Sequence, residues 1–156
     1  MHNLKQKRFL DEGAVFFRAV WIGNQKDPLT TKSEEGRYHT MDDMDRTIYL
    51  SATPETALHE VKKRWGGEVD EYVIVSARVK LRRCVDLTDQ GTQRQLKVAE
   101  KELAGDRWRS CQKVAATLRS KGYEGAWTYS AAHYPEGRSL IIFAENLESD
   151  SGVALE

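Results

Sequence analysis

The chain has 156 residues, a length that favours one domain with a sizeable core, so a single domain over 1–156 is expected. Its 24 basic and 24 acidic residues give a formal net charge of zero, which argues against a protein that binds nucleic acid through a broad basic surface. The sequence has no signal-peptide core, no membrane-length apolar run and no disulfide framework in its two cysteines. We therefore expect a cytoplasmic protein without membrane contact.

A buried strand is expected at 14–21, where Ala-Val-Phe-Phe-Arg-Ala-Val-Trp is rich in β-branched and aromatic residues. Arg18 interrupts this run. Because an unpaired buried charge is very unfavourable, Arg18 must either extend its charged end to solvent at a sheet edge or contact an anion. The strand pattern leaves both interpretations open.

A long loop is expected at 23–36, because this segment is polar and contains asparagine, aspartate, proline and glycine. Loops of this length are usually lids, binding segments or disordered. Gly36-Arg37-Tyr38-His39 follows, and a second polar stretch then leads to a short strand at 47–50. Arg37 is therefore flanked by two polar segments.

The run at 49–61, Tyr-Leu-Ser-Ala-Thr-Pro-Glu-Thr-Ala-Leu-His-Glu-Val, indicates a strand end, a turn and a helix start. Thr53 suits the N-cap, Pro54 suits the first helical position, and Glu55 places negative charge at the positive end of the helix dipole. Gly66-Gly67 supplies the stop. The apolar face of this helix is expected to contain Ala57, Leu58, Val61 and Trp65.

Glu60 lies beside that apolar face, so its carboxylate should border the core. The alternative is a surface pair with Arg64 at i+4, which would stabilise the helix by only about 0.2–0.5 kcal/mol. His59 and Glu60 together suggest a metalloprotease helix, but that zinc motif requires a second histidine where this chain has Lys63. The sequence therefore predicts no metal site.

The rest of the chain mixes strands and helices without regular alternation. Strands are expected at 71–81, 84–87, 125–129 and 139–144, and helices at 92–103 and 108–121. One face of the last helix should contain Trp108, Cys111, Val114, Ala115 and Leu118. Because regular alternation would mark a doubly wound sheet, its absence favours an α+β fold with a largely antiparallel or mixed sheet.

Three of these features, taken in order, resemble the RES family, which is named after an arginine, a glutamate and a serine. They are Gly36-Arg37-Tyr38-His39, the run at 49–60 and Ser130 at a strand end, with Phe17-Arg18-Ala19 ahead of them. The resemblance covers roughly residues 14–147, and its most specific part is the run at 49–61. One departure is that the segment between Tyr38 and Tyr49 lacks the glycine that many relatives carry, which affects the expected shape of this loop more than the chemistry.

The resemblance implies a RES-like bacterial toxin of a toxin–antitoxin pair that consumes NAD and has a core similar to that of ADP-ribosyltransferases. The name-giving residues, implied to be catalytic, match Arg37, Glu60 and Ser130. Other pocket positions, implied to bind NAD, match Arg18, Tyr38 and Tyr49. The resemblance implies no metal.

The resemblance also implies a protein partner, an antitoxin that commonly carries a helix-turn-helix DNA-binding part and blocks the pocket. Any contact with DNA would then be made by that partner, which agrees with the zero net charge of this chain. We expect the partner to bury Arg37 or the loop at 23–36.

Cleavage of the nicotinamide–ribose bond passes through an oxocarbenium-like transition state, comparable to that of glycoside hydrolysis. The Glu60 carboxylate could stabilise the developing positive charge or orient a nucleophile, and Ser130 offers a hydroxyl to ribose or phosphate. Nicotinamide is already a cationic leaving group that needs no protonation. No Ser-His-Asp arrangement is therefore implied, and His39, His59 and His133 are expected to be structural or loop residues.

Binding of NAD calls for groups that match its diphosphate and its ring. The planar donor fork of arginine matches phosphate oxygens, so Arg18 and Arg37 are the candidates. Tyr49 can stack on the nicotinamide ring with Tyr38 packed near it. The alternative for both tyrosines is ordinary core or loop packing.

Three functions remain open. In the leading interpretation, water or inorganic phosphate accepts the ADP-ribose of NAD. A mono-ADP-ribosyltransferase that modifies a host protein would use the same pocket residues. A non-catalytic module would hold a nucleotide or a partner without turnover.

Overall fold

The structure, a computed structural model, describes residues 4–24, 29, 35–67 and 71–156, in which seven strands form one sheet. The strands are β1 (Phe9–Trp21), β2 (Thr47–Ser51), β3 (Tyr72–Leu81), β4 (Cys84–Asp86), β5 (Gly125–Tyr129), β6 (Arg138–Phe143) and β7 (Gly152–Leu155). Their order is β4-β5-β6-β2-β1-β3-β7, and every neighbouring pair is antiparallel except β4 and β5. This confirms the expected α+β fold with a largely antiparallel sheet.

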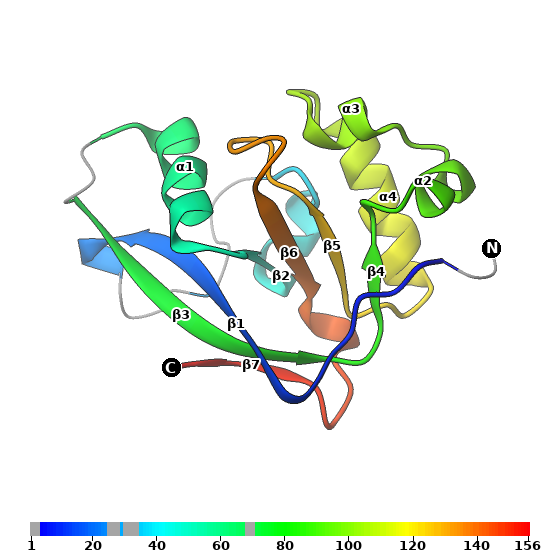
Figure 1. Ribbon diagram of the computed structural model, residues 1–156, viewed down its shortest axis with the longest axis horizontal. Coiled ribbons are helices and arrows are strands. Elements are labelled where there is room, and N and C mark those ends of the chain that lie inside the picture. The colour runs from blue at the N-terminus through cyan, green and yellow to red at the C-terminus, as the bar shows by residue number, and fades with distance from the viewer. Residues whose placement is uncertain (1–3, 25–28, 30–34, 68–70) are drawn as a thin grey trace.

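The helices form two groups (Figure 1). They are α1 (Pro54–Trp65), α2 (Gln90–Leu96), α3 (Glu100–Ala104) and α4 (Arg109–Ser120), with short 3-10 helices at Ile22–Asn24, Met41–Arg46 and Ala144–Asn146. Helix α1 packs against β1, β2 and β3, whereas α2, α3 and α4 gather near β4 and β5. Strands β5 and β6 lie between the two groups. No helix among the described residues has the length and apolar character to cross a membrane.

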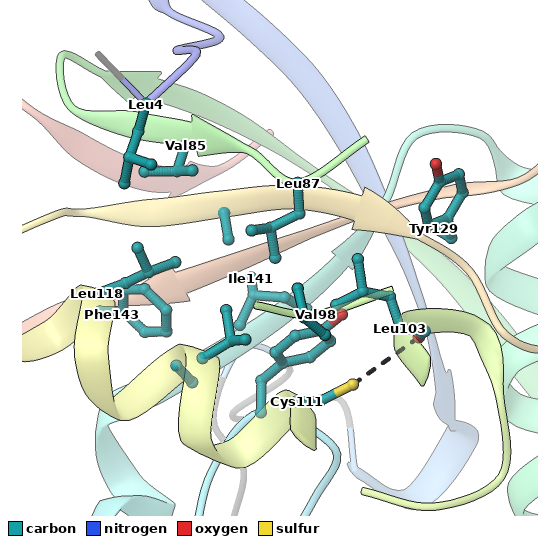
Figure 2. Packing of buried hydrophobic residues seen from close by; sticks show 14 residues of the cluster. Leu4, Val85, Leu87, Val98, Leu103, Cys111, Leu118, Tyr129, Ile141 and Phe143 are labelled. Carbon is teal, nitrogen blue, oxygen red and sulfur yellow. Dashed lines mark hydrogen bonds between the residues drawn. The ribbon is translucent and has the colours of Figure 1, made fainter. Parts of the chain in front are cut away.

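Two apolar clusters pack on opposite faces of the sheet, because neighbouring residues of a strand point to opposite sides. Ile141 of β6 belongs to the cluster under α2, α3 and α4, whereas Leu140 belongs to the other. In Figure 2, which shows the first cluster, the sulfur of Cys111 on α4 points to the carbonyl oxygen of Leu103 on α3, 3.8 Å away. Apolar contact therefore holds the helical layer on the sheet, and this polar contact joins two of its helices to each other.

Helix α1 begins and ends where the local signals predict. The Thr53 side chain accepts a hydrogen bond of 3.1 Å from the N–H of Thr56, and Pro54 is the first helical residue. Gly66 ends the helix with a φ of 72°, a conformation that favours glycine. Of the expected apolar face, Ala57 and Val61 are buried, Leu58 is half-buried, and the side chain of Trp65 lies outside the described part.

The single helix expected at 92–103 is wrong. Helix α2 ends at Leu96 and α3 begins only at Glu100. Lys97 between them adopts the left-handed conformation, with a φ of 55°, and Val98 is buried. Because Val98 lies off the apolar stripe of a continuous helix, its burial requires the chain to leave the helix at Lys97.

Several other boundaries differ from expectation. Strand β1 begins at Phe9, with a register shift near Gly13, and β7 was not expected at all. The 3-10 helix at Met41–Arg46 occupies part of the second polar stretch. Trp108 precedes α4 and is 37% exposed, so it does not belong to the buried face of that helix. Most of the loop expected at 23–36 lies outside the described residues.

Glu124, which no sequence pattern singled out, is a fully buried carboxylate with 0% exposure. Its Oε1 accepts hydrogen bonds from the backbone N–H groups of Arg82 and Arg83, at 2.8 and 2.9 Å, and its Oε2 accepts one from Glu148 at 2.9 Å. Burial opposes ionisation, but these donors stabilise the charge, and the pKa of Glu124 lies below its ordinary value. The carboxylate joins the β3–β4 turn to the segment before β7.

Candidate active site

Glu60 and Ser130 lie together although 70 residues separate them in the chain. Glu60 is on α1, and Ser130 directly follows β5. The Ser130 hydroxyl donates a hydrogen bond of 2.5 Å to Oε1 of Glu60, and Ser139 on β6 donates to the same oxygen at 3.5 Å. Within the described residues, the Glu60 carboxylate therefore accepts hydrogen bonds from two serines, which hold it against the sheet.

The loop after β5 holds Ser130 in a fixed orientation. Its N–H donates to the carbonyl of Gly137 at 3.0 Å, and its hydroxyl oxygen accepts from the N–H of His133 at 3.2 Å. A side chain at Gly137 would collide with His133, because an added Cβ would lie 2.8 Å from the Cβ and the carbonyl oxygen of His133. Since the hydroxyl oxygen already accepts from His133, its hydrogen is directed at Glu60.

The register of the sheet explains how this group forms. Ser139 on β6 pairs with Ser51 on β2 and with Thr128 on β5, so the three hydroxyl side chains lie in one row on the same face. All three are buried. Because Ser130 follows Thr128 by two residues, strand alternation brings it to the same side, beside Glu60.

Tyr38 and Tyr49 form a second group that adjoins this row. The hydroxyls of Tyr38 and Thr128 share a hydrogen bond of 2.9 Å. The Tyr49 hydroxyl accepts from the N–H of Tyr38 at 2.9 Å and lies 2.6 Å from Nδ1 of His39. Tyr38 is only 2% exposed and belongs to the apolar cluster, so core packing is established for it, while Tyr49 is half-buried against that cluster. Burial raises the pKa of both phenols above the ordinary value for tyrosine.

Arg37 is directed toward the helical layer. Its Nη1 donates to the carbonyl of Leu103 on α3 at 3.4 Å and lies 3.9 Å from the sulfur of Cys111 on α4. The residue is half-buried. Arg37 thus adjoins the group of Tyr38 through the backbone, while its charged end is bound to the α3–α4 junction.

Arg18 is a cation inside the sheet layer. It lies on β1 opposite Val75 of β3, and its Nη1 is buried and makes no hydrogen bond to any described residue. Burial lowers the pKa of Arg18, the positive charge of Arg64 on α1 lowers it further, and Tyr49 acts in the opposite direction. This end of the guanidinium therefore does not reach solvent.

The predicted residues are thus brought together in part. Glu60 meets Ser130, and Tyr38 meets Tyr49, but no hydrogen bond joins either arginine to Glu60 within the part of the chain that is described. Thr128 and Ser139, which connect the two groups, were not foreseen. Thr128 lies two residues before Ser130, and this alternation was the signal available in the sequence, whereas Ser139 joins the group only through strand pairing.

Two cavities among the described residues lie away from this group. One of about 280 Å³ opens beside α2 and α4, and another of about 370 Å³ lies along β3 and β7. The first is lined by Leu96, Lys97, Val98, Ser110, Lys113, Val114 and Thr117. Neither contains a predicted catalytic or NAD-binding residue, so the hydrogen-bonded geometry of Glu60 and Ser130 defines the candidate site.

Comparison with known proteins gives a match of one family and one fold. The sequence model of the RES domain matches residues 15–153. Among solved structures, a chain in the crystal structure of the M. tuberculosis MbcT–MbcA toxin–antitoxin complex is similar, with a TM-score of 0.74 and 17% identity, over 94% of this chain and 83% of that one. No curated protein matches. At 17% identity, the likeness to the solved structure shows a shared fold.

Proposed function

This chain belongs to the RES-domain family, and from that premise we propose that it is a bacterial toxin that cleaves NAD at the nicotinamide–ribose bond. The observation that carries this proposal is the hydrogen bond of 2.5 Å between Ser130 and Glu60. It places a carboxylate of fixed orientation at the junction of α1 and the β5–β6 loop.

Glu60 supplies the negative charge that the reaction requires. Breaking the glycosidic bond leaves positive charge on the ribose, which a nearby carboxylate stabilises. Ser130 and Ser139 both bind Oε1, so the second oxygen, which accepts no hydrogen bond from the described residues, is available to the sugar or to the incoming nucleophile. Ser130 acts by orienting the carboxylate and by offering its hydroxyl to ribose.

Arg18 supplies the diphosphate contact. A buried guanidinium with an unpaired Nη1 is unfavourable unless an anion meets it, and two phosphate oxygens match its donor fork. Arg37 contributes as a second cation. Because its Nη1 already donates to the carbonyl of Leu103, we expect Arg37 to attract the diphosphate by its positive charge and not to bind it through two hydrogen bonds.

The two tyrosines have different parts in this proposal. Tyr49 is half-buried, and we assign it the stacking contact with the nicotinamide ring, while its hydroxyl accepts from the backbone N–H of Tyr38. Tyr38 is enclosed in the core and bonded to Thr128. Tyr38 therefore supports the site through its hydrogen bond to Thr128 and offers little surface to the ligand.

The partner in this proposal is an antitoxin. Support comes from the family and from the similar fold of a chain that was crystallised in a toxin–antitoxin complex. The partner would cover the face that carries Arg37. It would also bring the DNA-binding part, commonly a helix-turn-helix, so that this chain, with zero net charge, would make no contact with DNA itself. We place this pair in the cytoplasm, where NAD is present.

Incubation of the purified chain with NAD labelled on the adenylate part tests the proposal. We expect release of nicotinamide and soluble labelled products, identified by mass spectrometry with and without inorganic phosphate. ADP-ribose alone indicates water as the acceptor, and a phosphorylated product indicates phosphate. Addition of cell lysate then tests protein modification, because a labelled protein band would favour a mono-ADP-ribosyltransferase. Absence of any NAD turnover would contradict the proposal and favour a binding module.

A further inference from the structure

Two histidines and a carboxylate gather at the N-terminal end of α1. Glu55 and His59 are on the helix, and His133 is in the loop that holds Ser130. One ligand atom from each of the three lies within 4.8 Å of those of the other two. The imidazole rings of His59 and His133 are stacked, with centroids 4.3 Å apart and planes 15° from parallel, and Nε2 of His133 lies 4.0 Å from Oε1 of Glu55.

Local and long-range features produce this cluster together. Glu55 and His59 are four residues apart, so the helix places them on one face, a turn from each other. His133 is brought to them by two hydrogen bonds, one from its N–H to the Ser130 hydroxyl at 3.2 Å and one of 2.9 Å between its Nδ1 and Oγ1 of Thr56. The cluster therefore has two exposed members on a rigid helix and a third member that is held in place.

We propose that Glu55, His59 and His133 bind a divalent transition-metal ion of the zinc class. Two imidazoles and one carboxylate are a donor set that zinc accepts, with water as the fourth ligand. This site does not use the metalloprotease motif, whose second helical histidine is absent here. The third protein ligand comes from a distant loop, which is why the spacing of residues along α1 did not reveal it.

Thr56 supports the site from behind. Metal-binding histidines usually donate their second ring N–H to a neighbouring oxygen, which fixes the tautomer and the ring orientation. When Nδ1–H of His133 donates to Thr56, the lone pair of Nε2 points to the side of Glu55. At zinc–nitrogen distances of about 2.0–2.1 Å, the ligand atoms of a tetrahedral site lie roughly 3.3 Å from one another. Here the three ligand atoms lie within 4.8 Å of one another, and the exposed side chains of Glu55 and His59 can rotate to bring them closer.

Binding of the ion would join α1 to the β5–β6 loop beside the candidate site. His59 precedes Glu60 in the chain, and the N–H of His133 holds the hydroxyl of Ser130. The ion would therefore restrict the two residues that carry the proposed chemistry. Binding itself does not depend on NAD cleavage, so it can be measured whether or not the proposed function holds.

The test is a zinc titration of the whole chain, prepared without a polyhistidine tag and stripped with a chelator. We expect one equivalent of Zn²⁺ by calorimetry, a higher Tm in its presence, and a visible Co²⁺ spectrum of a four-coordinate ion with nitrogen and oxygen ligands. His59→Ala, an exposed position where the fold should tolerate the change, should weaken binding by at least about tenfold. Glu136→Gln, an exposed acid in the same loop as His133, is the matched control and should bind as the parent does.

A second pair of variants separates this site from chance binding by exposed histidines. Thr56→Val keeps the shape of the side chain but removes the oxygen that contacts Nδ1 of His133, and it should lower the affinity for Zn²⁺ about 10–100-fold. Thr56→Ser keeps that oxygen and should bind Zn²⁺ as the parent does. Circular dichroism confirms that each variant is folded. The proposal is overturned if the parent binds no Zn²⁺ or Co²⁺, or if His59→Ala binds with the stoichiometry and affinity of the parent.

Discussion

The hydroxyl of Ser130 donates a hydrogen bond of 2.5 Å to the carboxylate of Glu60, and the donor is fully buried. A hydrogen bond to a charged group is about twice as strong as one between neutral groups, and burial strengthens it further. This contact holds the carboxylate against the sheet, and the catalytic role proposed for Glu60 requires such a fixed orientation.

Replacement of Glu60 by glutamine should abolish most NAD cleavage. Glu60→Gln keeps an oxygen for the Ser130 hydroxyl but removes the charge that stabilises the oxocarbenium-like transition state. We expect turnover to fall by at least about 10²-fold, with little change in Tm. Product release from labelled NAD measures the effect, and Glu136→Gln is the control. A variant as active as the parent would show that Glu60 is misassigned.

Removal of the Ser130 hydroxyl should act through Glu60. Loss of a hydrogen bond to a charged group, worth about 1.5–3 kcal/mol, predicts roughly a 10–100-fold decrease in kcat for Ser130→Ala. If the two residues act as one unit, the double variant Glu60→Gln/Ser130→Ala should be no slower than Glu60→Gln alone. Additive losses in this double-mutant cycle would mean that the serine has an independent role.

Replacement of Arg18 should weaken binding of the diphosphate without lowering the stability of the fold. Arg18→Met removes a buried, incompletely paired cation, so Tm should stay the same or rise, as when other buried charges are replaced by apolar groups. ADP-ribose at 100 times its Kd should stabilise the parent by about 2.7 kcal/mol, but should not stabilise the variant. Arg82→Met, an exposed arginine, is the control. An equal ligand-induced shift in Arg18→Met would remove Arg18 from the diphosphate site.

Glu124 should control the acid stability of the fold. Both carboxylate oxygens of Glu124 accept hydrogen bonds from backbone N–H groups. Glu124→Gln replaces one oxygen by an NH₂ group, which cannot accept such a bond, so we expect the free energy of unfolding to fall by about 2–4 kcal/mol at neutral pH. Because folding lowers the pKa of Glu124 from its ordinary value of 4.5, its contribution is present above that value and is lost as pH falls through the lower folded-state pKa. The stability difference between parent and variant, from urea unfolding, should therefore narrow below pH 4.5. A difference independent of pH would contradict the assigned ionisation.

The ends of helix α1 could be predicted from the sequence, whereas the break at Lys97 and strand β7 could not. Thr53, Pro54 and Gly66 act within a few residues of α1, and the structure confirms both ends of that helix. The break at Lys97 was missed because it depends on the burial of Val98 under neighbouring elements, a tertiary effect that overrides the helical pattern. Strand β7 was missed for the same reason, since it exists only through pairing with β3.

By itself, the sequence determined the α+β class, the span of α1, the placement of Glu60 beside an apolar face and, through its motifs, the family. These follow from capping, periodicity and order of residues, which act along the chain. Only the tertiary structure decided that Ser130 contacts Glu60, that Arg37 points to the α3–α4 junction, and that His133 reaches α1. The physical reason is that strand register and helix packing join residues many positions apart, and no local preference specifies which of them will meet.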